Sequence, residues 1–457
     1  MSAPARIPVD RLLGDLQRLC AQPSSVGQDR ELAGTANVVA DLLRQAGLST
    51  KIVRTAGAPV VLGRRTGRSP FTLLLYHHYD VAPAGPWRAW FHEPFQLAER
   101  EEILFGRGVA HGKGPLIAHL QALQALQEVD GELPCGIVVV VDGEGLAGSP
   151  HLDKVIARHK ELLRADACLG SAGERDAHKR PFCYSGSKGL LTVELSVSGM
   201  AHPLLPGLAA SVRNPAWRLV WALGHIKGED EDIRINGFYD DVEGPNRNEN
   251  ASLRKTRLDE AGRLMDWEMS EFLFGMSGVA LVRAETTLPT CNLSAFTVEP
   301  SGDLPNIPTA ASARIDFHLV PAQHPDIIIN LVREQLIARG CLDIKVERLS
   351  GGYPPTRTEP EHPFVQHVCA AGIPVCGEPF VLLPLGPFTQ PLHTFANHLG
   401  TPTAVVALKR NDSAVHGPNE RLPLEDLLRH GQLLMEISST CADQSSLVSQ
   451  GSTSSAQ

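Results

Sequence analysis

The sequence predicts an α/β fold in which a mostly parallel sheet carries helices on both faces and a smaller α+β domain is inserted into the chain. Apolar, strand-like runs alternate with helical segments up to about residue 170. From about Gly189 the pattern changes to strands that alternate apolar and polar residues, and strand–helix alternation returns after Gly352. Such alternation is typical of a parallel sheet covered by helices, with its functional site at the carboxyl ends of the strands.

The length of the chain supports two domains. Its 457 residues exceed what one hydrophobic core normally organises. We expect residues 1–188 and 353–442 to form the larger domain and residues 189–352 to form the inserted one. The tail 443–457 is rich in Ser, Thr and Gln, and we expect it to be disordered.

The elements of the larger domain follow from hydrophobic period and boundary residues. Segments 9–20 and 30–45 repeat apolar residues at helical spacing, and Gly47 is a plausible cap for the second. By the same criteria, strands are expected at 49–53, 59–62, 71–76, 136–141, 166–170, 380–385 and 403–408, and helices at 115–128, 150–163, 389–397 and 424–438.

The inserted domain shows the two-residue period of half-buried strands. Segment 191–197 alternates in this way, and segment 311–319 has apolar residues at its odd-numbered positions. Helices are expected at 214–223 and 325–338, and a further strand at 343–349.

Composition argues against several classes of partner. A hydrophobic content of 43% and a charged content of 20% are typical of a soluble globular protein. The net charge is −9 without a long basic run, which argues against nucleic acid and anionic membranes. We expect neither a secretion leader nor a membrane span, because no apolar stretch has the required pattern. Nine scattered cysteines without a Cys-x-x-Cys pair favour reduced thiols and a cytoplasmic location.

The most informative segment is the apolar run 73–76, which leads into His77, His78, Tyr79 and Asp80. Alternate side chains of a strand share a face, so His78 and Asp80 should project together at the strand end. A ring nitrogen with a carboxylate beside it suits a metal ligand and the partner that orients it. A His-x-Asp pair also occurs in solvated turns, so its interpretation depends on the segments that follow.

Those later segments carry a family resemblance. Residues 105–114 open a helix, residues 142–150 follow a buried strand, and residues 414–420 lie near the end of the chain. With 214–216, 237–242 and 317–321, they resemble the M20 metallopeptidases, a family of dipeptidases, carboxypeptidases and deacylases with two metal ions. The dipeptidase (carnosinase-like) branch is most similar, and the resemblance covers about residues 8 to 441. It implies a catalytic larger domain and an inserted lid domain through which two copies form a homodimer.

Most acids of the family's metal site are replaced in this chain. His78, Asp80 and His416 match the family's residues. The family's bridging carboxylate falls at His111, its Glu–Glu pair at Gly145 and Leu146, and its remaining metal-binding Asp at Ala172. Two neighbouring divalent ions repel strongly and need carboxylates to neutralise them. We therefore expect that the standard two-metal mechanism does not operate.

Three imidazoles remain at the site that the resemblance implies, those of His78, His111 and His416. Three histidine nitrogens and one open position form a known site for a single catalytic zinc, which lowers the pKa of its bound water to about 7. In the alternative, His111 is a neutral, hydrogen-bonded replacement in a site without metal. The sequence leaves both open, with at most one zinc.

Two carboxylates are candidates for acid–base catalysis. Asp80 can orient His78 or act as a general base, and its alternative is a hydrogen-bonding role alone. Glu144 precedes the family's base position by one residue. On an extended backbone that offset turns a side chain to the opposite face, so a surface or structural role is the alternative for Glu144.

Three residues of the inserted domain are candidates for substrate contacts. His202 matches the family's lid histidine, which reaches across the dimer to the other subunit's substrate and stabilises developing negative charge. Asn306 and His318 match positions that contact substrate termini, and His318 replaces an Arg that holds a carboxylate. Arg has a fixed fork and a permanent charge, so we expect a changed substrate; a core role is the alternative for His318. The family's Gly-Gly-Ser turn reads Gly386-Pro387-Phe388 here.

These observations leave three functions open. The first is an M20-like enzyme of specialised metabolism that acts on a small amide- or acyl-bearing molecule through a non-standard site. The second is a metal-independent enzyme of another class, catalysing cyclisation, acyl transfer or elimination. The third is a pseudoenzyme that binds a ligand or a partner. The retained histidines and Asp80 favour the enzymes, since buried titratable groups are costly to keep without use.

Overall fold

The computed structural model describes residues 5–175, 181–300, 302, 304–349 and 351–443. Contacts divide the chain into two compact units: the first comprises residues 1–187, 245–287 and 356–457, and the second comprises residues 188–244 and 288–355. Residues 245–287 fall within the range expected for the inserted domain, yet they group with the first unit. Apart from Asp443, the tail expected to be disordered lies outside the described residues.

The first unit is built on an eight-stranded sheet of order β1-β2-β6-β3-β7-β16-β8-β14. Its strands are β1 (Ser49–Val53), β2 (Val60–Arg65), β3 (Gly67–His78), β6 (Leu133–Asp142), β7 (Ala167–Ser171), β8 (Phe182–Tyr184), β14 (Val381–Leu383) and β16 (Thr403–Val406). The four central strands β6, β3, β7 and β16 run parallel. This confirms the predicted mostly parallel α/β sheet, and it brings four carboxyl strand ends to one edge.

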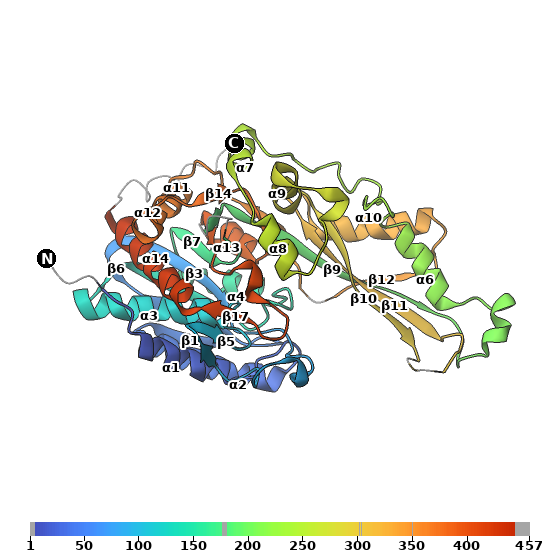
Figure 1. Ribbon diagram of the computed structural model, residues 1–457, viewed down its shortest axis with the longest axis horizontal. Coiled ribbons are helices and arrows are strands. Elements are labelled where there is room, and N and C mark those ends of the chain that lie inside the picture. Colours follow the sequence, from blue (N-terminus) through green and yellow to red (C-terminus); the bar gives the residue numbers. More distant parts are fainter. Residues whose placement is uncertain (1–4, 176–180, 301, 303, 350, 444–457) are drawn as a thin grey trace. The chain divides into compact units, whose positions relative to one another are not determined.

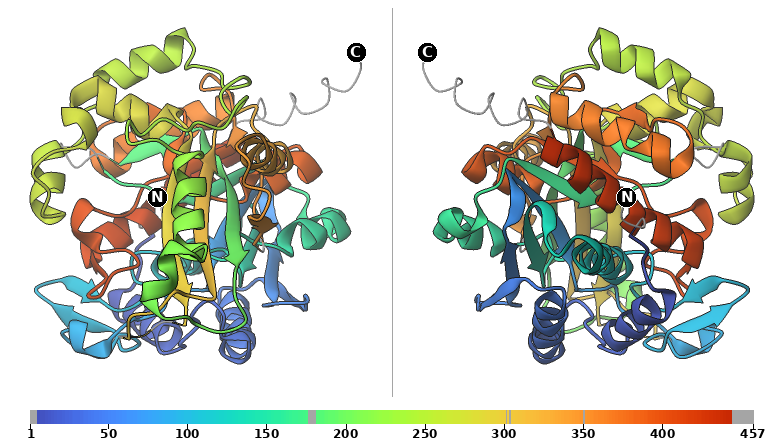
Figure 2. Two further views of the ribbon diagram at one scale, coloured as in Figure 1. Left: turned by 90° about the vertical axis from the view of Figure 1, so that its right-hand side faces the viewer. Right: turned by 90° about the vertical axis from the view of Figure 1, so that its left-hand side faces the viewer.

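Helices cover both faces of this sheet (Figure 1). One face packs against α1 (Val9–Cys20), α2 (Asp29–Gln45), α3 (Lys113–Asp130), α11 (Pro363–Ala370), α12 (Gly372–Cys376) and α14 (Leu424–Asp443). The other packs against α4 (Leu152–Arg158), α5 (Lys160–Leu163), α7 (Arg247–Lys255), α8 (Glu260–Asp266), α9 (Gly278–Thr287) and α13 (Leu392–Leu399). Helices α3 and α14 lie side by side, as the right-hand view of Figure 2 also shows.

Strand β3 explains how neighbouring residues reach different environments. Leu73 and Leu75 belong to the core beneath α3 and α14, whereas Leu74 and Tyr76 belong to the core on the opposite face. Because side chains alternate along a strand, His77 and His78 continue these two rows on opposite faces. A single strand therefore supplies one histidine to the core and one to the sheet edge.

The second unit contains a sheet of order β10-β11-β9-β12 and helices α6 (Pro215–Gly224) and α10 (Pro325–Ala338). Its strands are β9 (Gly186–Ser198), β10 (Thr290–Glu299), β11 (Ala310–Leu319) and β12 (Lys345–Arg348). The short strands β13 (Thr356–Arg357) and β15 (Gly386–Thr389), which also pair with β9, belong to the first unit. The odd-numbered residues of β11 from Ala311 to Leu319 are buried, as the alternating pattern predicts. Strand β10 was not predicted, because its residues from Asn292 to Thr297 are exposed and show no apolar row.

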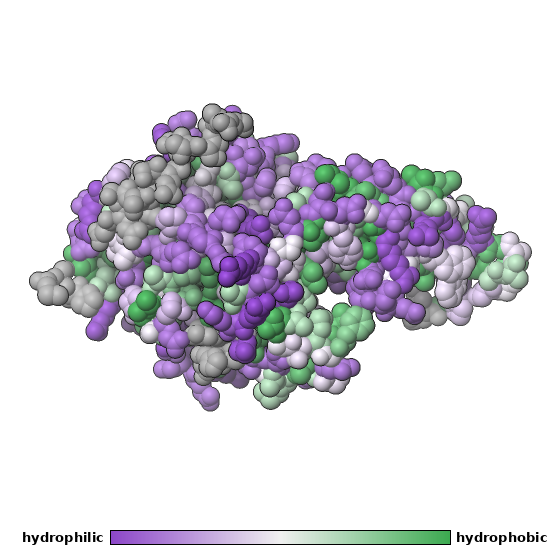
Figure 3. Space-filling model, turned by 90° about the horizontal axis from the view of Figure 1, so that it is seen from above, coloured by the Kyte–Doolittle hydropathy of each residue, from purple (hydrophilic) through white to green (hydrophobic). Residues whose placement is uncertain are grey.

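The remaining regular elements are short. Strands β4 (Ala98–Arg100), β5 (Ile103–Phe105) and β17 (Arg421–Pro423) form a three-stranded sheet. Single turns of 3-10 helix are η1 (Trp87–Ala89), η2 (Pro206–Ala210), η3 (Leu273–Gly275) and η4 (Asn411–Ser413). None of the helices in the described chain is long and apolar enough to cross a membrane. Polar side chains dominate the face drawn in Figure 3, with hydrophobic residues in small groups between them.

Candidate functional site

The candidate site of the first unit lies at the carboxyl edge of its central strands. His78 ends β3 and pairs with Asp142 at the end of β6. Val406 of β16 pairs with Ser171 of β7, so Ala172 and the segment after Val406 leave the sheet beside each other. Strand ends of a parallel sheet are the usual position of α/β active sites.

Asp80 is buried and fully engaged by hydrogen bonds. Its Oδ1 lies 3.0 Å from Nδ1 of His78 and accepts from the backbone N–H of Gly145 at 3.0 Å. Its Oδ2 accepts from the backbone N–H of Leu146 at 2.8 Å. Of the two predicted roles, this geometry favours orientation of His78, because three donors already occupy the carboxylate. Asp80 also holds the loop whose residues replace the family's Glu–Glu pair.

The environment of His78 favours its protonated form. Burial alone lowers the pKa of His78, but the hydrogen bonds and charge of Asp80 outweigh it, and the pKa is raised above its ordinary value. Since Nδ1 faces Asp80, the other ring nitrogen, Nε2, is the one left for a ligand or a proton transfer.

His111 lies against His78, and His416 lies against His111. The ring centroids of His78 and His111 are 4.8 Å apart and those of His111 and His416 are 5.2 Å apart. Nδ1 of His111 and Nε2 of His416 are separated by 3.2 Å, a hydrogen-bond distance. Burial, with the charges of His78 and Lys409, keeps the pKa of His111 well below its ordinary value. Burial and Lys409 lower the pKa of His416 to about 4.

Sequence reasoning assigned no role to the ion pair that holds these two histidines. Oε2 of the buried Glu420 binds Nη1 of Arg107 at 2.9 Å and the N–H of Gly108 at 3.0 Å. Oε1 accepts from the backbone N–H groups of Ala110 and His111. Arg107 also donates to the carbonyl oxygen of His416 at 3.3 Å. Only the neighbouring Gly-Arg-Gly and Asn-Glu motifs could have indicated this clamp.

The donor set does not fit the family's two metal ions. At four positions where family members carry acids, the chain has His111, Gly145, Leu146 and Ala172. Within the described ranges, no group of three or more His, Cys, Asp or Glu side chains is arranged to hold a metal ion. The 3.2 Å between ring nitrogens of His111 and His416 approaches the spacing of about 3.3 Å between two ligands of a tetrahedral zinc. Two nitrogens are fewer than the three protein ligands of a catalytic zinc site, so the side chains as they stand do not form the predicted zinc site.

The other predicted base, Glu144, is paired elsewhere. Its Oε2 lies 2.7 Å from Nδ1 of His151, and its own N–H donates to Asp142. The pairing supports the structural alternative for Glu144. Burial, reinforced by the charge of Asp80, raises the pKa of Asp142 to about 7.

Of the three predicted substrate residues in the second unit, the structure brings only two together. Leu204 and Ile307 form an isolated bridge, which joins the loops of the exposed His202 and of Asn306. His318 lies at the opposite end of the β9–β11 ladder, opposite Leu190, whereas Ser198 at the near end pairs with Ala310. Eight residues of strand correspond to about 26 Å. Within one protomer, therefore, His202 and His318 cannot contact one small substrate. Burial and Lys188 lower the pKa of His318 to about 4.

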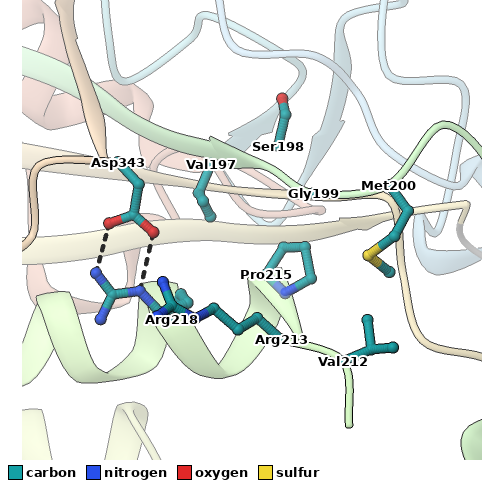
Figure 4. Close-up of a pocket in the computed structure, with 9 residues that line it drawn as sticks. All are labelled: Val197, Ser198, Gly199, Met200, Val212, Arg213, Pro215, Arg218 and Asp343. Atoms are coloured by element: carbon teal, nitrogen blue, oxygen red, sulfur yellow. Dashed lines mark hydrogen bonds and ion pairs between the residues drawn. The ribbon is translucent and has the colours of Figure 1, made fainter. Parts of the chain in front are cut away.

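A pocket of about 320 Å³ opens beside the segment that leads to His202 (Figure 4). Its lining residues are Val197, Ser198, Gly199, Met200, Val212, Arg213, Pro215, Arg218 and Asp343. Arg218 and Asp343 form a bidentate pair, with Nε and Oδ2 separated by 2.9 Å. The pocket shares the sheet end of His202 and Asn306 and is remote from His318.

Comparison with known proteins agrees with this architecture. The crystal structure of an M20 family metallo-carboxypeptidase from Sulfolobus solfataricus matches with a TM-score of 0.88 and 27% identity, over 95% of this chain and all of that one. Human carnosine dipeptidase 1 shares the fold, with a TM-score of 0.84 and 20% identity over 95% of this chain and 97% of that one.

Curated relatives align over a smaller part of the chain. A cysteinylglycine-S-conjugate dipeptidase of Corynebacterium striatum is 29% identical over 65% of this chain and 64% of its own length. A beta-Ala-His dipeptidase of Mus musculus is 25% identical over 61% of this chain and 58% of its own. The alignments therefore span less than two thirds of these relatives. The sequence profile of peptidase family M20/M25/M40 matches residues 74–439, and the chain belongs to this family.

Proposed function

We propose that the protein is an M20-like enzyme that acts on a small amide- or acyl-bearing molecule at the strand edge of His78, without a pair of metal ions. The observation that carries the proposal is the opposite direction of the pKa shifts in touching imidazoles. The pKa of His78 is raised, whereas those of His111 and His416 are lowered. Neighbouring groups whose environments separate their pKa values are typical acid–base pairs.

In this proposal His78 is the proton donor, and His111 or His416 is the proton acceptor. Asp80 orients the His78 ring and favours its charged form, so Nε2 of His78 donates a proton to the departing nitrogen or to an acyl oxygen. His111 and His416 stay neutral near pH 7, and one of their ring nitrogens accepts a proton from the attacking water. The Arg107–Glu420 clamp supports both rings through the backbone.

A second candidate is a site with a single zinc ion held by His78, His111 and His416. The spacing of the ring nitrogens of His111 and His416 favours it, because a cation can replace their shared proton. A zinc ion would supply an activated water. The third ligand requires reorientation of His78 or His111, which is why the metal-free version takes precedence.

A homodimer through the second unit completes the proposal. Strand β10 is an edge strand with exposed Leu293 and Phe296, and such edges pair readily with a second copy. The exposed Trp217 and Trp221 stack on α6. A second copy would offer its own His202 and would overcome the separation of His202 from His318 in one chain. Nine free cysteines support a reducing compartment such as the cytoplasm.

The test is turnover of a panel of N-acyl amino acids and dipeptides by chelator-treated protein. The proposal expects hydrolysis that survives chelation and falls by about 10²-fold or more in His78→Gln, the loss typical of a removed acid or base. His159→Gln, a change away from the strand edge, serves as the matched control and should stay active. Activity that needs two equivalents of metal contradicts the proposal. Ligand binding without any turnover would favour a pseudoenzyme.

A further inference from the structure

Lys409 lies at the same strand edge as the three histidines. It follows β16 by three residues, and its backbone N–H donates to the carbonyl oxygen of Gly173 at 3.3 Å. This position is adjacent to Ala172, where family members carry a metal-binding Asp. The Lys409 charge acts on both His111 and His416, so the ammonium lies within electrostatic reach of the histidine pair.

Four arginines near this edge have carboxylate partners. Arg107 pairs with Glu420, Arg175 and Arg410 pair with Asp426, and Arg263 pairs with Glu174 and Glu285. For the half-buried Lys409 ammonium, the described residues provide neither a hydrogen bond nor an ion pair. It therefore differs from these four arginines.

The acids closest to Lys409 are already engaged. Glu420 binds Arg107 and three backbone N–H groups, and Glu174 binds Arg263 at 2.8 Å. Burial lowers the pKa of Lys409, and the charges of these two acids oppose that effect by favouring the ammonium form. The charges of Glu174 and Glu420 thus act on Lys409, but neither carboxylate forms an ion pair with it.

The charge of this strand edge therefore differs from that of a metal cage rich in acids. Four positions that carry acids in the family are neutral here, at His111, Gly145, Leu146 and Ala172. The remaining carboxylate, Asp80, is occupied by His78 and two backbone N–H groups. An unpaired ammonium in such surroundings suits an anion, because the two acids that act on it, Glu174 and Glu420, are held by other partners.

We propose that Lys409, flanked by His111 and His416, forms a binding site for the carboxylate group of a small organic ligand. The ammonium supplies a charge-assisted hydrogen bond, and the two imidazoles can add N–H donors. The inference deepens the proposed function, on which it rests, by naming a carboxylate as the group that the strand edge recognises. It also assigns carboxylate recognition to Lys409 in place of His318, which lacks the fixed charge of Arg.

The experiment compares two ligands that differ only in charge, N-acetylglycine and its neutral amide N-acetylglycinamide, by calorimetric titration of the full chain. Unaltered protein should bind the carboxylate more tightly. Lys409→Met should weaken N-acetylglycine by about tenfold or more, the usual effect of losing a hydrogen bond to a charged group. It should leave N-acetylglycinamide unchanged, and Lys409→Arg should retain the preference. Lys154→Met, on the exposed face of α4, is the matched control and should behave like the unaltered protein.

Equal affinity for both ligands in the unaltered protein overturns the inference, as does full carboxylate binding by a folded Lys409→Met protein. The proposed function is tested separately by turnover. Lys409-dependent binding without hydrolysis of any amide supports the carboxylate site and counts against the enzyme. Hydrolysis that is indifferent to Lys409 and to ligand charge supports the enzyme and counts against the carboxylate site.

Discussion

Oε1 of Glu420 lies 3.1 Å from the backbone nitrogen of His111, and this hydrogen bond joins positions 309 residues apart. The same carboxylate neutralises Arg107, which in turn donates to the carbonyl oxygen of His416. Both histidine loops of the candidate site are therefore fixed by one buried ion pair.

Removal of Glu420 should destabilise the first unit strongly. Glu420→Ala leaves the guanidinium of Arg107 buried and unpaired, and breaking a buried pair on one side typically costs about 3–5 kcal/mol. Urea unfolding, followed by circular dichroism, measures the change. Glu425→Gln removes an exposed pair with Arg429 and should alter the free energy of unfolding by about 0.5 kcal/mol or less. Similar values for the two variants would refute the clamp.

Asp80→Asn should lower the pKa of His78. The oxygen of the neutral amide can still accept from one of the backbone N–H groups of residues 145 and 146, but the amide no longer supplies the charge that opposes burial. Burial then dominates, and the pKa should move below its ordinary value of 6.5. An NMR titration of the histidine ring protons measures the shift, with His159 as an internal reference. An unchanged pKa of His78 would show that Asp80 does not control it.

Stability should fall as the pH decreases from about 6 to 3. His77, His119 and His430 are buried beneath α3 and α14, with Nε2 of His77 3.0 Å from Nδ1 of His119 and with the rings of His119 and His430 stacked. Burial lowers the pKa of His77 and of His430 to about 3, below the 6.5 of the unfolded chain. The unfolded state therefore binds protons first, and each pH unit in this window should cost up to about 1.4 kcal/mol per histidine.

The variant His430→Phe tests this account, since it keeps a ring on His119 and removes one titrating group. Between pH 6 and 4, its free energy of unfolding should change less with pH, because unfolding takes up as much as one proton fewer than in the unaltered protein. His398→Gln changes a histidine paired with the exposed Asp153 and should keep the original slope. If the free energy of unfolding depends equally on pH in the unaltered protein and in both variants, buried neutral histidines are not the cause.

Charge on the exposed face of the second unit should dissociate the proposed homodimer. Phe296→Lys places a charge on the edge strand β10, and Trp217→Lys places one on the stacked pair of α6. Sedimentation velocity should then show monomers, whereas Ile337→Lys, at an exposed position of α10, should leave the dimer intact. A monomeric unaltered protein at micromolar concentration would remove this part of the proposal.

Sequence reasoning predicted the fold well where hydrophobic periods were long. Helix 325–338 and strand 49–53 have the predicted bounds, because their periods are uninterrupted and their ends carry clear boundary residues. Helices α7, α8 and α9 were not predicted. They are short, and their packing within the first unit depends on contacts with distant strands such as β14 and β15.

The candidate site was predictable only in part. His78, His111 and His416 could be brought together because strand-end position and family resemblance both pointed to them. Glu420, Arg107 and Lys409 could not be assigned roles, since their interactions join loops hundreds of residues apart and have no local period. Glu144 illustrates a further limit, because its pairing with His151 depends on a loop conformation.

The most direct test of the central claim is the metal content of protein purified without chelators and then equilibrated with excess zinc, measured by mass spectrometry of the native protein. The account predicts no more than one ion per chain, because four acids of the family's cage are absent and the family carboxylate that remains, Asp80, is engaged by His78 and two backbone N–H groups. Two tightly bound ions per chain, lost together in His416→Ala, would contradict it.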